Sequence, residues 1–295
     1  FLLEPQSTNL IRYSEDFSNS YWLKLNNVNV SNEKVISPDG TLNASQLIYD
    51  GTSGGRIERG IGGLTQGADY TVSVYARVSS GTQAVRLGSV NDFEYTLTTE
   101  WQRLTSTQPE NDTVAYPRLI CNDTATIEIW AFQLEQQSFA TSYIPTSGAT
   151  ATRNQELCTN ATPVINSEEG TLYFEGSALA DDGTSRNISI FQNGGNFIKF
   201  LYSPTSNRVD FVAFSSGALS CNITKVITNT TDNNKFALKW KLNDFALWIN
   251  GVEVGTDTSG NTPIGMDKIS FTNEGGSSGN FFGNTKGLKV YPKAL

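Results

Sequence analysis

In Gln133–Arg153, QLEQQSFATSYIPTSGATATR, one sequence pattern ends and another begins. Ala125–Leu134, which runs into this stretch, alternates with a period of two and is rich in β-branched and aromatic residues, as a β-strand is. The alternation then stops: Pro145 cannot donate to a strand ladder, and Gly148 loosens the backbone. We therefore predict the edge of one all-β module here and the start of a second.

The alternation also assigns side chains to faces. In Ala125–Leu134 it places Ile127, Ile129 and Ala131 on one face and Glu128, Trp130 and Phe132 on the other. In Asp69–Val78, the clearest strand, it separates Tyr70, Val72, Val74 and Ala76 from Thr71, Ser73, Tyr75 and Arg77. Phe139, Tyr143 and Ile144 are too apolar for a free linker, so we expect them to dock on the first module.

Length and composition favour two all-β domains. The chain has 295 residues, 17% of them charged, and many of the short strands are separated by Gly, Asn, Ser and Thr. We predict two antiparallel β-sandwich (jelly-roll) domains in tandem, residues 1–150 and 151–295. A net charge of −8 without a basic cluster argues against nucleic acid as a partner. The sequence has no apolar run of about 18 residues, so we expect no membrane insertion.

The chain contains no histidine, which removes Ser-His-Asp and Cys-His catalysis and histidine metal sites together. Cys121, Cys158 and Cys221 are widely spaced and form no zinc motif. We expect them to be buried as small apolar residues, although one disulfide is compatible with the spacing. No cofactor is expected.

Both ends of the first module resemble a segment that recurs in bacteriophage tail and fibre proteins. The opening is LLEPQSTNLIRYSEDFSNSYW, Leu2–Trp22, and the closing stretch is the one quoted above, with Gln137 where the usual form has Gly. There these segments open and close a carbohydrate-binding-module-like jelly roll. The resemblance implies that fold, a position on the virion surface, and glycan binding by one sheet face.

The second module, from Glu169 to the end, resembles a concanavalin A-like (laminin G-like) domain. EGTLYFEGSA, the ALWINGV hairpin and the closing GLKVYPKAL carry the resemblance. Some members of that family cleave polysaccharides, with carboxylates two and four residues apart on one strand, or with a histidine. This sequence has neither pattern, so we predict that it is not an enzyme.

Sugar-binding faces combine aromatic rings with Arg, Asn and carboxylate groups. In the first module the candidates are Arg56, Tyr75, Arg77 and Trp130, with packing of Tyr75 and Trp130 under a loop or against the second module as the alternative. In the second module the candidates are Trp240 and Trp248, with core packing as the alternative. Asp181 and Asp182 lie in a loop and are weak calcium candidates, the alternative being a solvated turn.

We therefore expect a non-enzymatic protein of a phage virion surface, in a tail or head fibre, that binds a host cell-surface glycan or supports host attachment. Its further partners would be other virion proteins and, as a possibility, further copies of itself. The alternative is a carbohydrate-binding appendage of a secreted bacterial polysaccharide-active enzyme. The chain starts at Phe1 rather than Met, which is compatible with a fragment of a longer protein.

Overall fold

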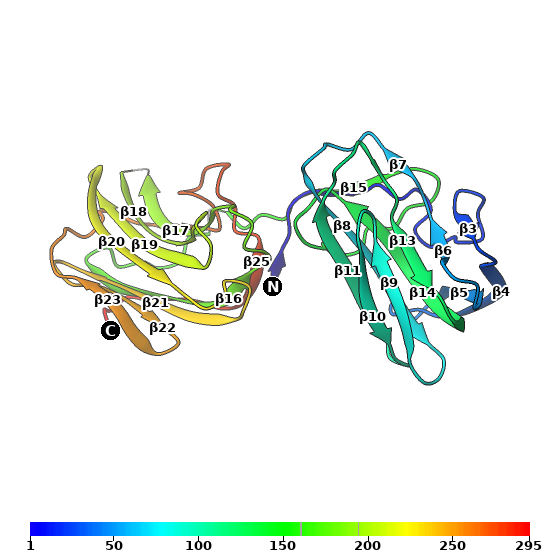
Figure 1. The fold of residues 1–295 in the computed structure, drawn as a ribbon. Coiled ribbons are helices and arrows are strands. Elements are labelled where there is room, and N and C mark those ends of the chain that lie inside the picture. The colour runs from blue at the N-terminus through cyan, green and yellow to red at the C-terminus, as the bar shows by residue number, and fades with distance from the viewer. Residues whose placement is uncertain (160, 194) are drawn as a thin grey trace. The chain divides into compact units, whose positions relative to one another are not determined.

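The computed structural model describes residues 1–159, 161–193 and 195–295. They form two compact units, which we call the N-terminal unit (Gln6–Asn154) and the C-terminal unit (Phe1–Pro5 with Gln155–Leu295). Regular structure in the described residues consists of strands, paired antiparallel throughout both units (Figure 1). The predicted all-β, antiparallel sandwich class is confirmed.

The N-terminal unit is a sandwich of two five-stranded sheets around one core. The first sheet has the order β11 (Gln102–Pro109), β8 (Asp69–Val78), β14 (Thr124–Glu135), β5 (Leu42–Asp50), β4 (Asn29–Ile36). The second has the order β10 (Asp92–Leu97), β9 (Gln83–Gly88), β13 (Arg118–Cys121), β6 (Gly55–Glu58), β3 (Leu23–Leu25). Two short pairs complete it: β12 (Val114–Ala115) with β7 (Ile61–Gly62), and β15 (Ala151–Arg153) with β2 (Ser7–Asn9).

Strand β8 follows the predicted alternation. Tyr70, Val72, Val74 and Ala76 are buried in the core between the sheets. Tyr75 and Arg77 therefore lie on the outer face of the first sheet. This outward row continues on the neighbouring strands, because antiparallel partners in register present their side chains on the same face.

Strand β14 departs from the predicted alternation after Trp130. Ala131 has a φ of 60°, and the pairing with β8 shifts between Trp130 and Gln133, which marks a β-bulge. The extra residue turns Phe132 into the core, where it is fully buried, instead of leaving it beside Trp130. The predicted shared face of Trp130 and Phe132 is therefore wrong, and the bulge is the reason.

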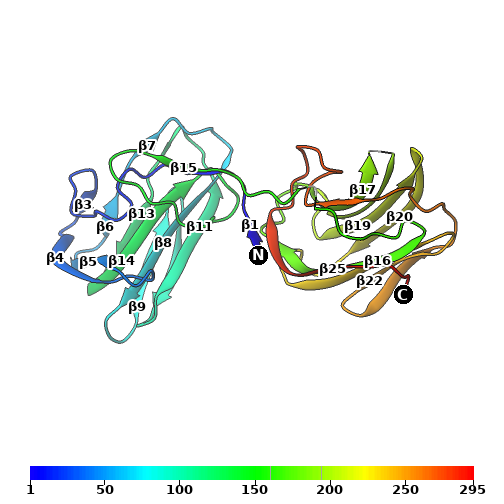
Figure 2. The same ribbon diagram turned by 180° about the vertical axis from the view of Figure 1, so that it is seen from behind.

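The C-terminal unit is a second sandwich. Its six-stranded sheet has the order β1 (Leu2–Leu3), β25 (Gly283–Tyr291), β16 (Glu169–Ala178), β21 (Asn234–Lys241), β22 (Phe245–Ile249), β23 (Val252–Asp257). Its five-stranded sheet has the order β20 (Ala218–Val226), β19 (Arg208–Ser215), β18 (Asn196–Tyr202), β17 (Arg186–Asn193), β24 (Lys268–Ser270). Figure 2 shows β16 and β25 in the first sheet, and β17, β19 and β20 in the second. An aromatic-rich core lies between them.

The boundaries of the units differ from the predicted 1–150 and 151–295. Leu2 and Leu3 form β1, which pairs with the last strand of the C-terminal unit, so the first five residues belong to that unit. Ala151–Arg153 pairs with β2 and belongs to the N-terminal unit. Both exchanges are pairings between residues far apart in the sequence, which local patterns do not reveal.

Two smaller predictions concern the C-terminal hairpin and the cysteines. Asn250 and Gly251 both have positive φ values, 52° and 85°, as the predicted type I′ turn between β22 and β23 requires. Cys121 and Cys221 are buried, Cys158 is partly buried, and all three are free thiols. Within the described residues, the structure contains no helix long and apolar enough to cross a membrane.

Candidate functional site

Two rows of outward side chains cross the first sheet of the N-terminal unit. One row runs from Arg103 through Tyr75 to Trp130, which are direct cross-strand partners. The second runs from Trp101, just before β11, through Arg77 and Glu128 to Gln46. We call these seven residues the aromatic–arginine face. Three of the four site residues predicted in this module, Tyr75, Arg77 and Trp130, lie together on it.

Arg77 is the centre of this face. Its Nε donates to Glu128 Oε2 at 2.6 Å, and its guanidinium lies over the Trp101 ring, 4.7 Å from the centroid. Glu128 also accepts a hydrogen bond from Gln46 Nε2 at 3.4 Å. The Glu128 side chain is 5% exposed and that of Arg77 is 28% exposed. Arg77 therefore anchors a buried carboxylate through one N–H, and its other donors belong to a side chain that solvent partly reaches.

The aromatic rings of this face have different roles. Trp130 is only 6% exposed: Tyr75 packs against it at 5.5 Å between ring centroids, and Tyr143 at 4.9 Å. Tyr75 also lies under the Arg103 guanidinium, at 5.6 Å. Tyr75 and Trp101 are partly exposed. A ligand can therefore reach Trp101 and Tyr75, whereas Trp130 supports them from below and cannot be an open platform.

The segment after β14 covers Trp130, as predicted for its apolar residues. Ile144 is buried, and the Tyr143 hydroxyl donates to Glu15 Oε1 at 2.9 Å. Arg103 holds the same segment in place, because its Nη2 donates to the Thr141 carbonyl at 2.6 Å. Burial raises the pKa of the Tyr143 phenol, so it is a neutral hydrogen-bond donor at physiological pH. The floor of the face is therefore fixed before any ligand arrives.

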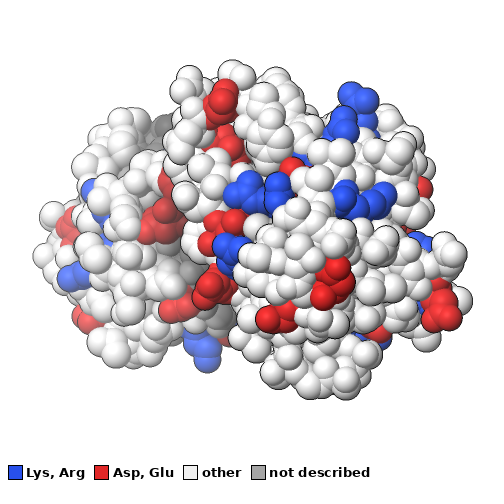
Figure 3. Space-filling model, turned by 45° about the vertical axis from the view of Figure 1, so that its right-hand side comes forward, with Lys and Arg blue, Asp and Glu red and all other residues white. Residues whose placement is uncertain are grey.

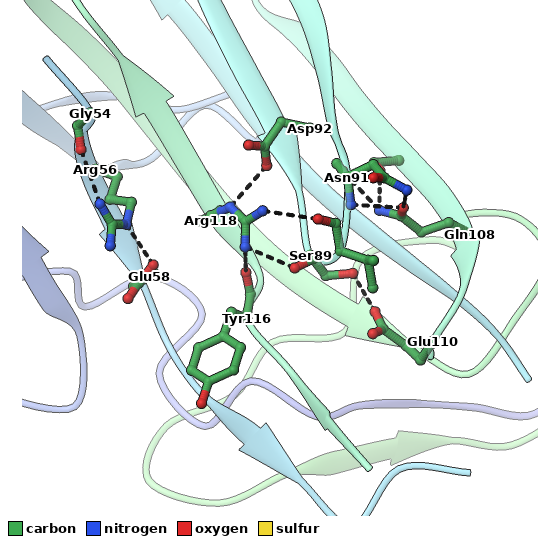
Figure 4. Close-up of polar contacts among 12 residues, drawn as sticks. Gly54, Arg56, Glu58, Ser89, Asn91, Asp92, Gln108, Glu110, Tyr116 and Arg118 are labelled. Carbon is green, nitrogen blue, oxygen red and sulfur yellow. Dashed lines mark hydrogen bonds and ion pairs between the residues drawn. The ribbon is translucent and has the colours of Figure 1, made fainter. Parts of the chain in front are cut away.

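Arg56, the fourth predicted residue, is on the opposite sheet. It lies on β6 next to core residue Ile57, and its Nε pairs with Glu58 Oε2 at 2.7 Å. Figure 4 shows it near Arg118, which pairs with Asp92 at 2.9 Å. Alternation correctly predicts that Arg56 points outward, but it does not say on which sheet. Arg56 therefore does not belong to the aromatic–arginine face.

The two tryptophan candidates of the C-terminal unit occupy opposite sides of one sheet. Trp240 is fully buried in the core, and its Nε1 donates to the Asn166 carbonyl at 3.0 Å. It offers no ring face to a ligand, and the core alternative describes it. Trp248 is partly exposed on the outer face, with the Lys239 ammonium 5.4 Å from its ring centroid.

The calcium candidates are engaged by protein donors. Asp181 Oδ2 accepts hydrogen bonds from Ser206 Oγ and from the Asn207 amide, the latter at 3.0 Å. Asp182 pairs with Arg186 at 2.9 Å. In the described part of the chain, no three metal-binding side chains lie close enough together to hold an ion. Both carboxylates therefore act as loop anchors.

One open cleft, of about 450 Å³, carries two carboxylates, Glu15 and Asp16. A glycosidase needs one carboxyl with a raised pKa as proton donor. Hydrogen bonding from Ser18 lowers the pKa of Asp16 instead. Glu15 accepts hydrogen bonds from Tyr143 and Asn43. Asp16 therefore does not meet the requirement for the proton donor.

Sequence reasoning missed Trp101 and Arg103 as site residues. Their alternation is visible in Trp101–Leu104, and it predicts that both point to one face while Leu104 enters the core, as it does. What joins them to Tyr75 and Arg77 is the register of β11 against β8. That register is a long-range pairing, which the local pattern does not specify.

No protein-family model and no curated protein matches the chain. Several solved structures are similar. Sheep galectin-11 in complex with glycerol matches 46% of this chain and 96% of its own, at 8% identity and a TM-score of 0.32. Mouse laminin α1 domains LG4-5 match 90% of this chain and 93% of their own, at 9% identity and a TM-score of 0.33. The CBM22-1–CBM22-2 tandem domain of Paenibacillus barcinonensis Xyn10C matches 97% of this chain and 98% of its own, at 10% identity and a TM-score of 0.34. All three TM-scores are below 0.5.

Proposed function

We propose that this chain is a non-enzymatic glycan-binding protein and that the aromatic–arginine face is its binding surface. The row Trp101–Arg77–Glu128–Gln46 supports the proposal most strongly. It places a partly exposed ring beside outward guanidinium N–H groups and an amide. Rings pack on the apolar faces of sugars, while guanidinium and amide groups bond their hydroxyls.

The rigidity of this surface also supports recognition. Arg77 is held by Glu128, and Trp101 is held by a hydrogen bond from its Nε1 to the Ile36 carbonyl at 3.3 Å. Groups that are already in position lose little conformational entropy when a ligand binds. A sheet face of this kind suits a polymer, because a saccharide chain can cross several strands.

Binding to a panel of bacterial surface polysaccharides tests this proposal, with the full chain and two variants. Trp101→Ala removes the exposed ring and leaves the Arg77–Glu128 pair intact, and we expect at least about fivefold weaker binding. The control is Arg56→Ala, because Arg56 resembles Arg77 in exposure and in its carboxylate partner but lies on the other sheet. Equal affinities of the wild type and Trp101→Ala would show that the aromatic–arginine face is not the binding surface.

We propose that the setting is a phage virion, in which the chain contributes to a tail or head fibre on the surface and contacts a host-cell glycan. The resemblance of Leu2–Trp22 and Gln133–Arg153 to phage tail and fibre segments supports this setting. Labelling of intact virions with an antibody against the chain tests it. Absence of the chain from purified virions would favour the alternative, an appendage of a secreted polysaccharide-active enzyme.

A further inference from the structure

The surface of the N-terminal unit carries two adjoining hollows. Their volumes are about 330 Å³ and about 290 Å³, and they share Leu10 and Gly62 as lining residues. Tyr21, Arg12 and Arg59 line the smaller one. We call the two hollows together the arginine groove. It involves none of the seven residues of the aromatic–arginine face.

The arginine groove is positively charged, although the chain carries a net charge of −8. Asp and Glu are absent from the lining of both hollows. Arg12 is exposed, and neither Arg12 nor Arg59 forms an ion pair with any residue that the structure describes. On the face of the molecule drawn in Figure 3, Lys and Arg are interspersed with Asp and Glu. Two unpaired guanidinium groups in one hollow are a site for an anion.

Both arginines of this groove contact Tyr21. Arg59 lies over the Tyr21 ring, 4.5 Å from the centroid, and its Nη1 donates to the Tyr21 carbonyl at 3.0 Å. Its Nε has no acceptor among the described residues. The Arg12 amide donates to the Tyr21 hydroxyl at 3.2 Å. Burial raises the pKa of Tyr21, and the hydrogen bond from the Arg12 amide and the charges of Arg59 and Arg12 oppose that shift.

The rest of the arginine groove is neutral and polar. Gln6 and Gln136 are exposed side chains with amide donors and acceptors. Gly62 and Gly63 leave the backbone open: a Cβ on Gly63 would meet no atom within 4 Å, and one on Gly62 would meet only Val114 Cγ2, at 3.9 Å. Amides and bare peptide groups bond hydroxyls, and the Leu10 side chain adds an apolar contact.

We propose that the arginine groove binds a saccharide unit that carries an oxyanion, with Arg12 and Arg59 on the oxyanion and the amide-lined hollow on the hydroxyls. The inference deepens the proposed function, on which it rests, by naming an acidic glycan as its ligand class. An added protein strand fits less well, because β7 offers an edge of only two residues, Ile61 and Gly62.

Titration calorimetry of the full chain tests the inference, with polygalacturonate, dextran sulfate and neutral dextran as probes. The variants are Arg12→Gln and Arg59→Gln, and the control is Arg86→Gln. Arg86 is also partly exposed and unpaired among the described residues, but it lines a separate hollow with Glu94 and Asp123. Gly62→Leu is the uncharged test, since it fills the floor that both hollows share.

We expect polygalacturonate or dextran sulfate to bind, and the one that binds identifies the carboxylate or the sulfate as the oxyanion. We expect Arg12→Gln, Arg59→Gln and Gly62→Leu each to weaken that binding about tenfold and Arg86→Gln to change it less than twofold. Equal effects of Arg12→Gln and Arg86→Gln, or equal binding of dextran, would overturn the inference.

Trp101→Ala in the same titrations separates the two sites. Loss of acidic-glycan binding on Arg12→Gln but not on Trp101→Ala would support the arginine groove and count against the aromatic–arginine face. The reverse result would overturn the arginine groove and leave the proposed function in place.

Discussion

Removing Arg77 and removing the charge of Glu128 should cost different amounts of stability, because the two paired side chains differ in exposure. Glu128 is 5% exposed and Arg77 is 28% exposed. Arg77→Met leaves a buried carboxylate whose remaining described side-chain donor is Gln46, at 3.4 Å. Glu128→Gln leaves a guanidinium that water already reaches. Removing the cation should therefore cost more stability than neutralising the anion.

The free-energy cost of each substitution can be worked out from the burial of Glu128 and the partial exposure of Arg77. An uncompensated buried charge costs about 3–5 kcal/mol, and the partial exposure of Arg77 reduces the cost of Arg77→Met to about 3 kcal/mol. Loss of one hydrogen bond to a solvated charge costs about 1 kcal/mol, which we expect for Glu128→Gln. In a unit of this size, the melting temperature should fall by about 6–12 °C for Arg77→Met and by about 2–4 °C for Glu128→Gln.

Differential scanning calorimetry of the full chain measures both shifts, in the transition of the N-terminal unit. Arg56→Met is the matched control: its partner Glu58 is 11% exposed, so water relieves more of the charge left behind, and the loss should be smaller than for Arg77→Met. If Glu128→Gln destabilises the unit as much as Arg77→Met, the claim that Arg77 compensates the buried charge of Glu128 is wrong.

Three further predictions concern single residues. Glu110 is fully buried (Figure 4), and burial raises its pKa above that of the unfolded chain. The folded state therefore binds more protons between the two pKa values, and the stability of the N-terminal unit falls as pH rises from about 4.5. Glu110→Gln should flatten this pH dependence, as measured by urea titrations of the full chain at several pH values. Gly170→Ala would place a Cβ 2.2 Å from Trp240 Cζ2, so the C-terminal unit should lose about 3 kcal/mol or more, whereas Gly62→Ala, with 3.9 Å to its nearest atom, should lose less than about 1 kcal/mol. Asn250→Ala puts alanine at a φ of 52° and removes the acceptor of the Lys235 amide, so thermal melting should show a loss of about 1–2 kcal/mol, of which Asn250→Gly should recover part.

Where the strands are regular, local alternation was sufficient to predict which residues face outward, but not which residues of other strands lie beside them. It placed Tyr75 and Arg77 on an outer face correctly. Alternation also predicts that Trp240 is buried, because Trp240 has the same phase as the core residues Phe236 and Leu238. Trp248 lies on the outer face. These assignments need only the period of two.

What alternation could not supply depends on long-range pairing and on backbone irregularity. The bulge at Ala131 moved Phe132 into the core, and an alanine in the left-handed region leaves no signal in the sequence. The separation of Arg56 from Arg77 depends on which strands share a sheet. The arginine groove combines residues from segments about 50 positions apart, around Arg12 and Arg59, and no motif links them.

Whether the aromatic–arginine face binds the glycan can be decided by a nuclear magnetic resonance titration of the full chain with the best-binding glycan, observing tryptophan and arginine side-chain N–H groups. We expect the Trp101 Nε1–H and Arg77 Nε–H signals to shift and reach saturation, because both residues lie on the aromatic–arginine face. The Arg56 Nε–H signal should stay in place. Saturable shifts at Arg56 or Trp248, without a shift at Trp101 and Arg77, would contradict it.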